Sequence, residues 1–135
     1  MIKVPPRWIL EPTDKAFAQG SDARVECKAD GFPKPQVTWK KAAGDTPGDY
    51  TDLKLSNPDI SVEDGTLSIN NIQKTNEGYY LCEAVNGIGA GLSAVIFISV
   101  QGNTLFAIIS FLLLLILLII FISLESQLHP TLRSN

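Results

Sequence analysis

Two cysteines, a tryptophan and a tyrosine stand at a spacing that few folds share. Cys27 and Cys82 bound a 56-residue segment, and Trp39 follows the first cysteine by twelve residues. Tyr80 lies two residues before the second cysteine. This spacing is typical of two packed β-sheets that a disulfide joins, with an indole packed against the bridge and a buried tyrosine at a strand corner. The alternative is a pair of unpaired thiols in a reducing compartment.

Together these residues predict an all-β immunoglobulin-like sandwich with a Cys27–Cys82 disulfide. Residues 6–101 supply the roughly 100 residues that such a domain needs. Closing the 56-residue loop contributes about 4 kcal/mol on the chain-entropy model. A structural disulfide of this kind predicts an oxidising compartment.

Alternation of apolar and polar residues predicts the strands. Inward positions are expected at Ala23, Val25, Cys27 and Ala29, at Val37 and Trp39, at Leu67, Ile69 and Ile72, and at Tyr80, Cys82 and Ala84, with short strands at 60–62 and 94–100. The structural positions are expected to be Trp39, Tyr80, Val37, Leu67 and Gly78. Val4-Pro5-Pro6 fits an interdomain joint or a first edge strand. Residues 42–59, rich in Gly, Pro, Asp and Asn, favour loop over regular strand.

Residues 105–124 read LFAIISFLLLLILLIIFISL and carry no charge. Twenty such residues, as a helix, cross a hydrocarbon core of about 30 Å. A buried core helix is the alternative, but the rest of the chain is too small to surround a helix that is apolar on every side. The predicted organisation is a joint at 1–5, an immunoglobulin-like domain at 6–101, a linker at 102–104, a single C-terminal transmembrane α-helix at 105–124 and a tail at 125–135.

Three motifs carry a closer resemblance. GFPKPQVTW at 31–39 matches the G-x-P-x-P-x-V-x-W pattern of intermediate-set immunoglobulin domains, GYYLC at 78–82 matches G-x-Y-x-C, and AVNGIG at 84–89 matches A-x-N-x-x-G. Asn76 departs from the set, which usually has aspartate there. A charged partner at that corner is therefore not expected, although the asparagine oxygen can still accept a backbone hydrogen bond.

Residues 4–101 further resemble the Down syndrome cell adhesion molecule family in its many-isoform invertebrate form. The segments VPPRWILEPTDKAFAQGSDARVECKADGFPKPQVTWKKA and NIQKTNEGYYLCEAVNGIGAGLSAVIFISVQ carry this resemblance. They look most like the constant domain that follows the last variable immunoglobulin domain. The resemblance implies a spacer domain of a homophilic neuronal receptor involved in axon guidance and self-recognition. The implied partners are other immunoglobulin domains of the same receptor, or of an identical receptor on another cell.

No catalytic constellation is visible, so we expect no enzyme activity, cofactor or small-molecule substrate. His129, the one histidine, follows the apolar segment. The acidic residues Asp49, Asp52, Asp59, Glu63 and Asp64 favour a solvated loop over a calcium site, because the twelve-residue calcium-loop pattern is absent. The glycines at 87–91 favour a hairpin over a phosphate loop, since another apolar segment follows. A net charge of −3 without a basic block argues against nucleic acid.

The outer face of the strand around Tyr80 is the candidate contact surface. Tyr79, Leu81 and Val85 are expected to point outward beside Glu83. Such residues form a contact surface or are ordinary exposed side chains. We expect no aromatic-rich anchor cluster on this face, and the sequence contains no N-x-S/T sequon.

The expected location is the plasma membrane, with one span and the immunoglobulin domain outside. Residues 1–7 lack the apolar region of a signal peptide, which leaves two alternatives open. One is a tail-anchored protein whose domain stays in the cytosol with reduced cysteines. The other is a gene-model fragment of a longer receptor, in which the Leu, Ile, Phe and Ser of the apolar segment translate intron sequence.

Overall fold

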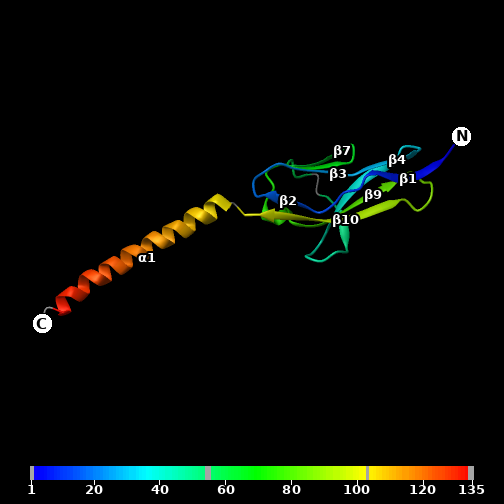
Figure 1. Ribbon diagram of the computed structural model, residues 1–135. Coiled ribbons are helices and arrows are strands. Elements are labelled where there is room, and N and C mark those ends of the chain that lie inside the picture. The colour runs from blue at the N-terminus through cyan, green and yellow to red at the C-terminus, as the bar shows by residue number, and fades with distance from the viewer. Residues whose placement is uncertain (1, 54–55, 103, 134–135) are drawn as a thin grey trace. The chain divides into compact units, whose positions relative to one another are not determined.

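The computed structural model describes residues 2–53, 56–102 and 104–133. The chain divides into two compact units, Met1–Gln101 and Gly102–Asn135. Figure 1 shows that the first unit consists of strands and the second of a single helix. The predicted fold class, an immunoglobulin-like sandwich followed by an apolar helix, is confirmed.

The larger sheet of the first unit has the strand order β2-β10-β9-β5-β6. Its neighbours pair antiparallel, except that β2 runs parallel to β10. Because side chains alternate between the two faces of a strand, one face of this sheet carries the buried side chains, among them Trp39, Tyr80, Cys82, Ile96 and Ile98. The strands are β2 (Lys15–Ala18), β10 (Leu92–Gln101), β9 (Gly78–Val85), β5 (Gln36–Ala42) and β6 (Tyr50–Asp52).

The opposing layer has two parts, a three-stranded sheet of order β3-β8-β7 and the pair β1-β4. The strands are β3 (Ala23–Glu26), β8 (Thr66–Ile69), β7 (Ile60–Glu63), β1 (Val4–Leu10) and β4 (Lys28–Phe32). β3 and β4 lie on either side of Cys27 and pair with different strands: β3 pairs with β8, and β4 pairs with β1. The bridging cysteine therefore occupies the break between two sheet segments.

The core lies within the first unit. Its most buried members alternate along the strands, as the period of two requires. They are Ala23, Val25, Cys27, Trp39, Leu67, Ile69, Ile72, Tyr80, Cys82, Ile96, Ile98 and Val100, each at most 4% exposed. Every one of them lies between residues 23 and 100, so this unit supplies all of the side chains in its own core.

Three details differ from the sequence expectations. Residues 42–59, predicted as loop, contain the short strand β6, which pairs with β5 from Ala42 to Lys40. Ala29 was predicted to point inward but is only half-buried in β4. Val4 and Pro5, placed in the joint at 1–5, lie in β1, where Val4 pairs with Phe32, as the alternative of a first edge strand predicted. β6 and the start of β1 are strand through their backbone pairing, which composition does not report.

The second unit is α1 (Thr104–Arg133). Its segment Ala107–Leu128 has 22 residues and a mean hydropathy of 3.3, and it is long and apolar enough to cross a membrane. The helix continues beyond the predicted span at 105–124 into the predicted tail. Residue 103 of the predicted linker, the last two residues of the tail, and the side chains of 104–106 and 129–133, His129 among them, lie outside the described parts.

The corner before β9 is closed by the tyrosine that the sequence singled out. A 3₁₀ turn, η1 (Lys74–Asn76), leads into β9. The Tyr80 hydroxyl donates to the backbone oxygen of Asn76, and the Asn76 side-chain oxygen accepts from the Gln73 amide at 2.8 Å. Burial raises the pKa of the Tyr80 phenol. The neutral Asn76 side chain therefore accepts the backbone hydrogen bond that was expected of it.

Trp39→Ala should lower the free energy of unfolding by about 3–5 kcal/mol, because it leaves a large cavity in the core. Tyr80→Phe should cost about 1–2 kcal/mol, since only the hydroxyl bond to Asn76 is lost. Denaturant unfolding of residues 2–101 followed by circular dichroism measures both. A larger loss for Tyr80→Phe than for Trp39→Ala would contradict the core arrangement.

Candidate functional site

The disulfide joins the two layers at the centre of the domain. Cys27 and Cys82 are bonded, with their Cα atoms 6.7 Å apart, and both side chains are fully buried. Trp39 lies directly across from Cys82 in the β5–β9 register and is 4% exposed. The predicted disulfide between the two layers, with the Trp39 indole beside it, is therefore present.

Gly65 completes this centre; in the sequence, Asp64-Gly65 predicts only a turn. Its backbone oxygen accepts from the Trp39 indole Nε1 at 3.1 Å and from the Cys27 amide at 3.0 Å. A Cβ at position 65 would lie 2.2 Å from the Cys27 oxygen, and the φ of +79° is one that side chains rarely adopt. Only glycine fits here. The Asp64-Gly65 sequence indicates the turn conformation, but it does not indicate the two hydrogen bonds that the Gly65 oxygen accepts.

The other structural candidates lie around the core. Leu67 is 1% exposed, and Val37 is half-buried and packs against the core cluster. Gly78 is buried at the start of β9 and has a φ of +152°. These side chains support the sandwich and contribute no reactive group.

The outward face of β9 carries the predicted contact residues. Tyr79 and Leu81 are half-buried, and Val85 is 49% exposed. β10 adds apolar neighbours, because Phe97 lies across from Tyr79 and Val95 across from Leu81. The Tyr79 and Phe97 rings meet edge to face, with centroids 4.9 Å apart.

This ring pair adds to the outer face an aromatic contact that the sequence did not predict. The run at 94–98 is apolar on both faces, so alternation could not place Phe97 outside. Lys40 lies across from Leu81, and its Nζ lies 3.2 Å from a carboxylate oxygen of Glu83; each of these two side chains is 35% exposed. The outer face is therefore apolar, and the Lys40–Glu83 ion pair lies beside it. We define this outer face as Tyr79, Leu81, Val85, Val95 and Phe97.

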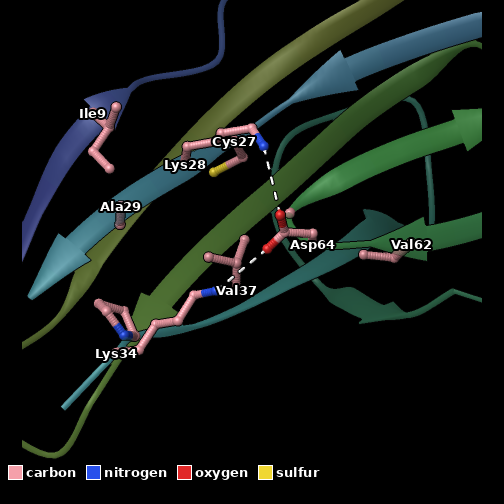
Figure 2. A pocket seen from close by; sticks show the side chains of 10 residues that line it. Ile9, Cys27, Lys28, Ala29, Lys34, Val37, Val62 and Asp64 are labelled. Carbon is pink, nitrogen blue, oxygen red and sulfur yellow. Dashed lines mark ion pairs between the residues drawn. The ribbon is translucent and has the colours of Figure 1, made fainter.

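A groove of about 310 Å³ opens beside Cys27. Figure 2 shows Lys28 and Lys34 converging on Asp64 among the residues that line the groove. Their Nζ atoms lie 3.8 and 3.6 Å from the carboxylate oxygens, and the Asp64 side chain is 73% exposed. Exposed pairs of this kind contribute little, because water screens them. The groove therefore holds the two ion pairs of Asp64, which water screens, and no reactive constellation.

The remaining candidates concern metals and phosphates. Within the described residues, no three His, Cys, Asp or Glu side chains lie together where they could hold a metal ion. The glycine segment at 87–91 joins β9 to β10, and Gly87, Gly89 and Gly91 all have positive φ. It is the predicted hairpin. No helix follows it to bind a phosphate, because β10 begins at Leu92.

Comparison with known proteins agrees with this architecture. The immunoglobulin domain family matches residues 5–86. The chain is 82% identical over 100 residues to the cell adhesion molecule Dscam1 of Drosophila melanogaster and 37% identical over 106 residues to Dscam2 of the same species. These alignments cover 74% and 78% of this chain but only 5% of each relative.

A solved structure matches as well. The crystal structure of the N-terminal eight immunoglobulin domains of Down syndrome cell adhesion molecule isoform 1.30.30 superimposes with a TM-score of 0.72 at 81% identity. The match covers 75% of this chain and 13% of that one. These similarities confirm the resemblance to the Down syndrome cell adhesion molecules. With the family match over residues 5–86 and the disulfide-pinned sandwich, the chain belongs to the immunoglobulin domain family.

Proposed function

We propose that this chain is a non-enzymatic adhesion and recognition module, a spacer immunoglobulin domain of a homophilic neuronal receptor that acts in axon guidance and self-recognition. The observation that carries the proposal is the 82% identity over 100 residues to Drosophila Dscam1, a cell adhesion molecule. Identity at this level extends over the surface as well as the core. It therefore supports a shared role as well as a shared fold.

The chemistry of the domain supports binding over catalysis. The groove beside Cys27 holds two ion pairs that share Asp64 and that water screens, and the most buried side chains of the domain are apolar. The partners we propose are other immunoglobulin domains of the same receptor, or of an identical receptor on another cell. Tyr79, Leu81 and Val85, with the two β10 residues of the outer face, are the proposed contact residues for such a domain.

We also propose a plasma-membrane location, with one span and the immunoglobulin domain outside. Two observations support it. The Cys27–Cys82 disulfide requires an oxidising compartment for its formation. The segment Ala107–Leu128 has the length and hydropathy of a membrane-spanning helix.

As a spacer, the isolated domain should bind itself weakly or not at all. The Tyr79 and Phe97 rings cover each other and do not project as separate anchors. Analytical ultracentrifugation of residues 2–101 at tens of micromolar should show a monomer. A tight dimer that Leu81→Lys returns to monomer would contradict the spacer role and show that the outer face pairs two copies of this same domain.

The adhesion role can be tested in the relative. Residues 4–101 should replace the corresponding domain of full-length Drosophila Dscam1 without loss of homophilic aggregation between transfected cells. A chimera carrying Trp39→Ala serves as the control, because a domain with a large cavity in its core should be retained before the surface. A folded chimera that reaches the surface at the parental level but does not aggregate cells would contradict the proposal.

A further inference from the structure

The sequence contains one Asn-Gly pair, Asn86-Gly87, at the start of the hairpin between β9 and β10. Asparagine followed by glycine is the pair that deamidates fastest in an unfolded chain, because glycine has no side chain to shield its backbone nitrogen. Gly87 is exposed, and a Cβ on it would meet nothing within 4 Å. The glycine side of the pair is therefore open, and any protection has to come from the asparagine side.

Deamidation begins when the backbone nitrogen of Gly87 attacks the side-chain carbon Cγ of Asn86. The new N–Cγ bond forms and the Cγ–Nδ2 bond breaks. The amide proton of Gly87 passes to a base, while water supplies the proton with which Nδ2 leaves as ammonia. A second water molecule then opens the succinimide ring at one of its two carbonyls, which leaves an aspartate or an isoaspartate carboxylate. Water is thus the one co-reactant.

Three hydrogen bonds hold the Asn86 side chain in the folded domain. Its Nδ2 donates to the backbone oxygen of Val4 at 2.7 Å and to that of Pro33 at 2.9 Å. Its Oδ1 accepts from the amide of Ile88 at 3.0 Å. Carbonyls only accept and a backbone N–H only donates, so these partners fix which way the amide faces. The reacting group is therefore bonded to the start of β1, to the β4–β5 loop and to its own hairpin.

These bonds oppose both parts of ring closure. Attack makes Cγ tetrahedral and moves Nδ2 and Oδ1 out of their common plane, so bonds that now have good geometry must bend or break. Nδ2 must also gain a proton before it can leave as ammonia. The two groups that it contacts, the oxygens of Val4 and Pro33, can only accept a proton's hydrogen bond and cannot supply the proton. The folded arrangement therefore slows deamidation.

The protection depends on a short stretch of strand. Val4 pairs with Phe32 at the start of β1, and the register shifts between this pair and the next, Arg7 with Asp30. Figure 1 shows β1 and β4 side by side here. The Phe32 side chain is 51% exposed, so little apolar surface is buried at this end of the pair. Local opening of such a stretch costs less free energy than unfolding the whole domain.

We propose that Asn86-Gly87 is a conditional deamidation site, which the folded domain protects and which release of the start of β1 opens to ring closure. The change is one-way. An aspartate at position 86 keeps the bond from Ile88, but its other oxygen faces the two carbonyl oxygens that Nδ2 now contacts, and these groups repel. An isoaspartate also lengthens the backbone of the hairpin by one carbon. The modified chain therefore cannot restore the bonds to Val4 and Pro33.

The test follows residues 2–101, a unit that contains its own core, during incubation at neutral pH. Peptide mapping by mass spectrometry measures the loss of Asn86 in the folded protein with its disulfide intact and in the reduced, denatured chain. Asn86 should deamidate at least about tenfold more slowly in the folded protein, since ring closure there waits for hydrogen bonds to open. Asn57 is the internal standard: Pro58 follows it, and a proline nitrogen has no proton to lose, so Asn57 should persist in both samples.

Gly31→Ala tests the bonds directly. A Cβ at Gly31 would lie 3.0 Å from Asn86 Nδ2 and 3.0 Å from the Val4 oxygen, so it pushes the two partners apart. This variant should deamidate about tenfold faster than the folded parent, because one hydrogen bond is lost. A variant that lacks residues 2–5 removes the Val4 oxygen and should behave in the same way. Gly44→Ala is the matched control, because a Cβ there meets nothing within 4 Å, and its rate should equal that of the parent.

Equal rates of Asn86 loss in the folded and the denatured chain would overturn the protection. Parental rates in both Gly31→Ala and the variant without residues 2–5 would show that the bond to Val4 does not provide it. Denaturant unfolding of each variant separates local from global opening. Rates that rise only in proportion to the lost global stability would contradict the inference. Hydrogen exchange tests the one-way release: the amides around Val4 and Phe32 should exchange faster in deamidated protein, and unchanged exchange would contradict it.

Discussion

The covalent bond between the two layers is the constraint on which the rest of the domain depends. Cys27 lies at the break between β3 and β4, and Cys82 lies in the middle of β9. The Gly65 carbonyl adds two hydrogen bonds at the same place, one from the Cys27 amide and one from the Trp39 indole. A small β-domain buries too little apolar surface to hold two sheets together with a wide margin of stability. The disulfide and the two hydrogen bonds at this centre therefore fix the separation of the sheets.

The sequence predicted this centre well because its residues are chemically distinctive. Cysteine, tryptophan and tyrosine at set spacings indicate partners far along the chain, and the structure places Cys27, Trp39 and Cys82 together. Gly65 was missed, since a turn glycine does not reveal which donors its carbonyl meets. Phe97 was missed because its segment is apolar on both faces. β6 was missed because its three residues are strand only through their pairing with β5.

The functional surfaces were harder to predict than the core for the same physical reason. A buried position is set by alternation within one strand, whereas a surface patch is set by register between strands. Tyr79 and Leu81 were found from β9 alone, but their neighbours on β10 required the pairing. The hydrogen bonds of the Asn86 side-chain amide with Val4, Pro33 and Ile88 likewise require three separate backbone segments to meet, which no single motif reports.

The most direct measurement of the central claim is the unfolding free energy of residues 2–101 with the disulfide intact and reduced. The intact protein should show no thiol accessible to alkylation by mass spectrometry after denaturation. Reduction should then lower the unfolding free energy by about 4 kcal/mol, the chain-entropy value for a loop of this length. Two alkylated thiols in a folded protein, with unchanged stability on reduction, would contradict the account.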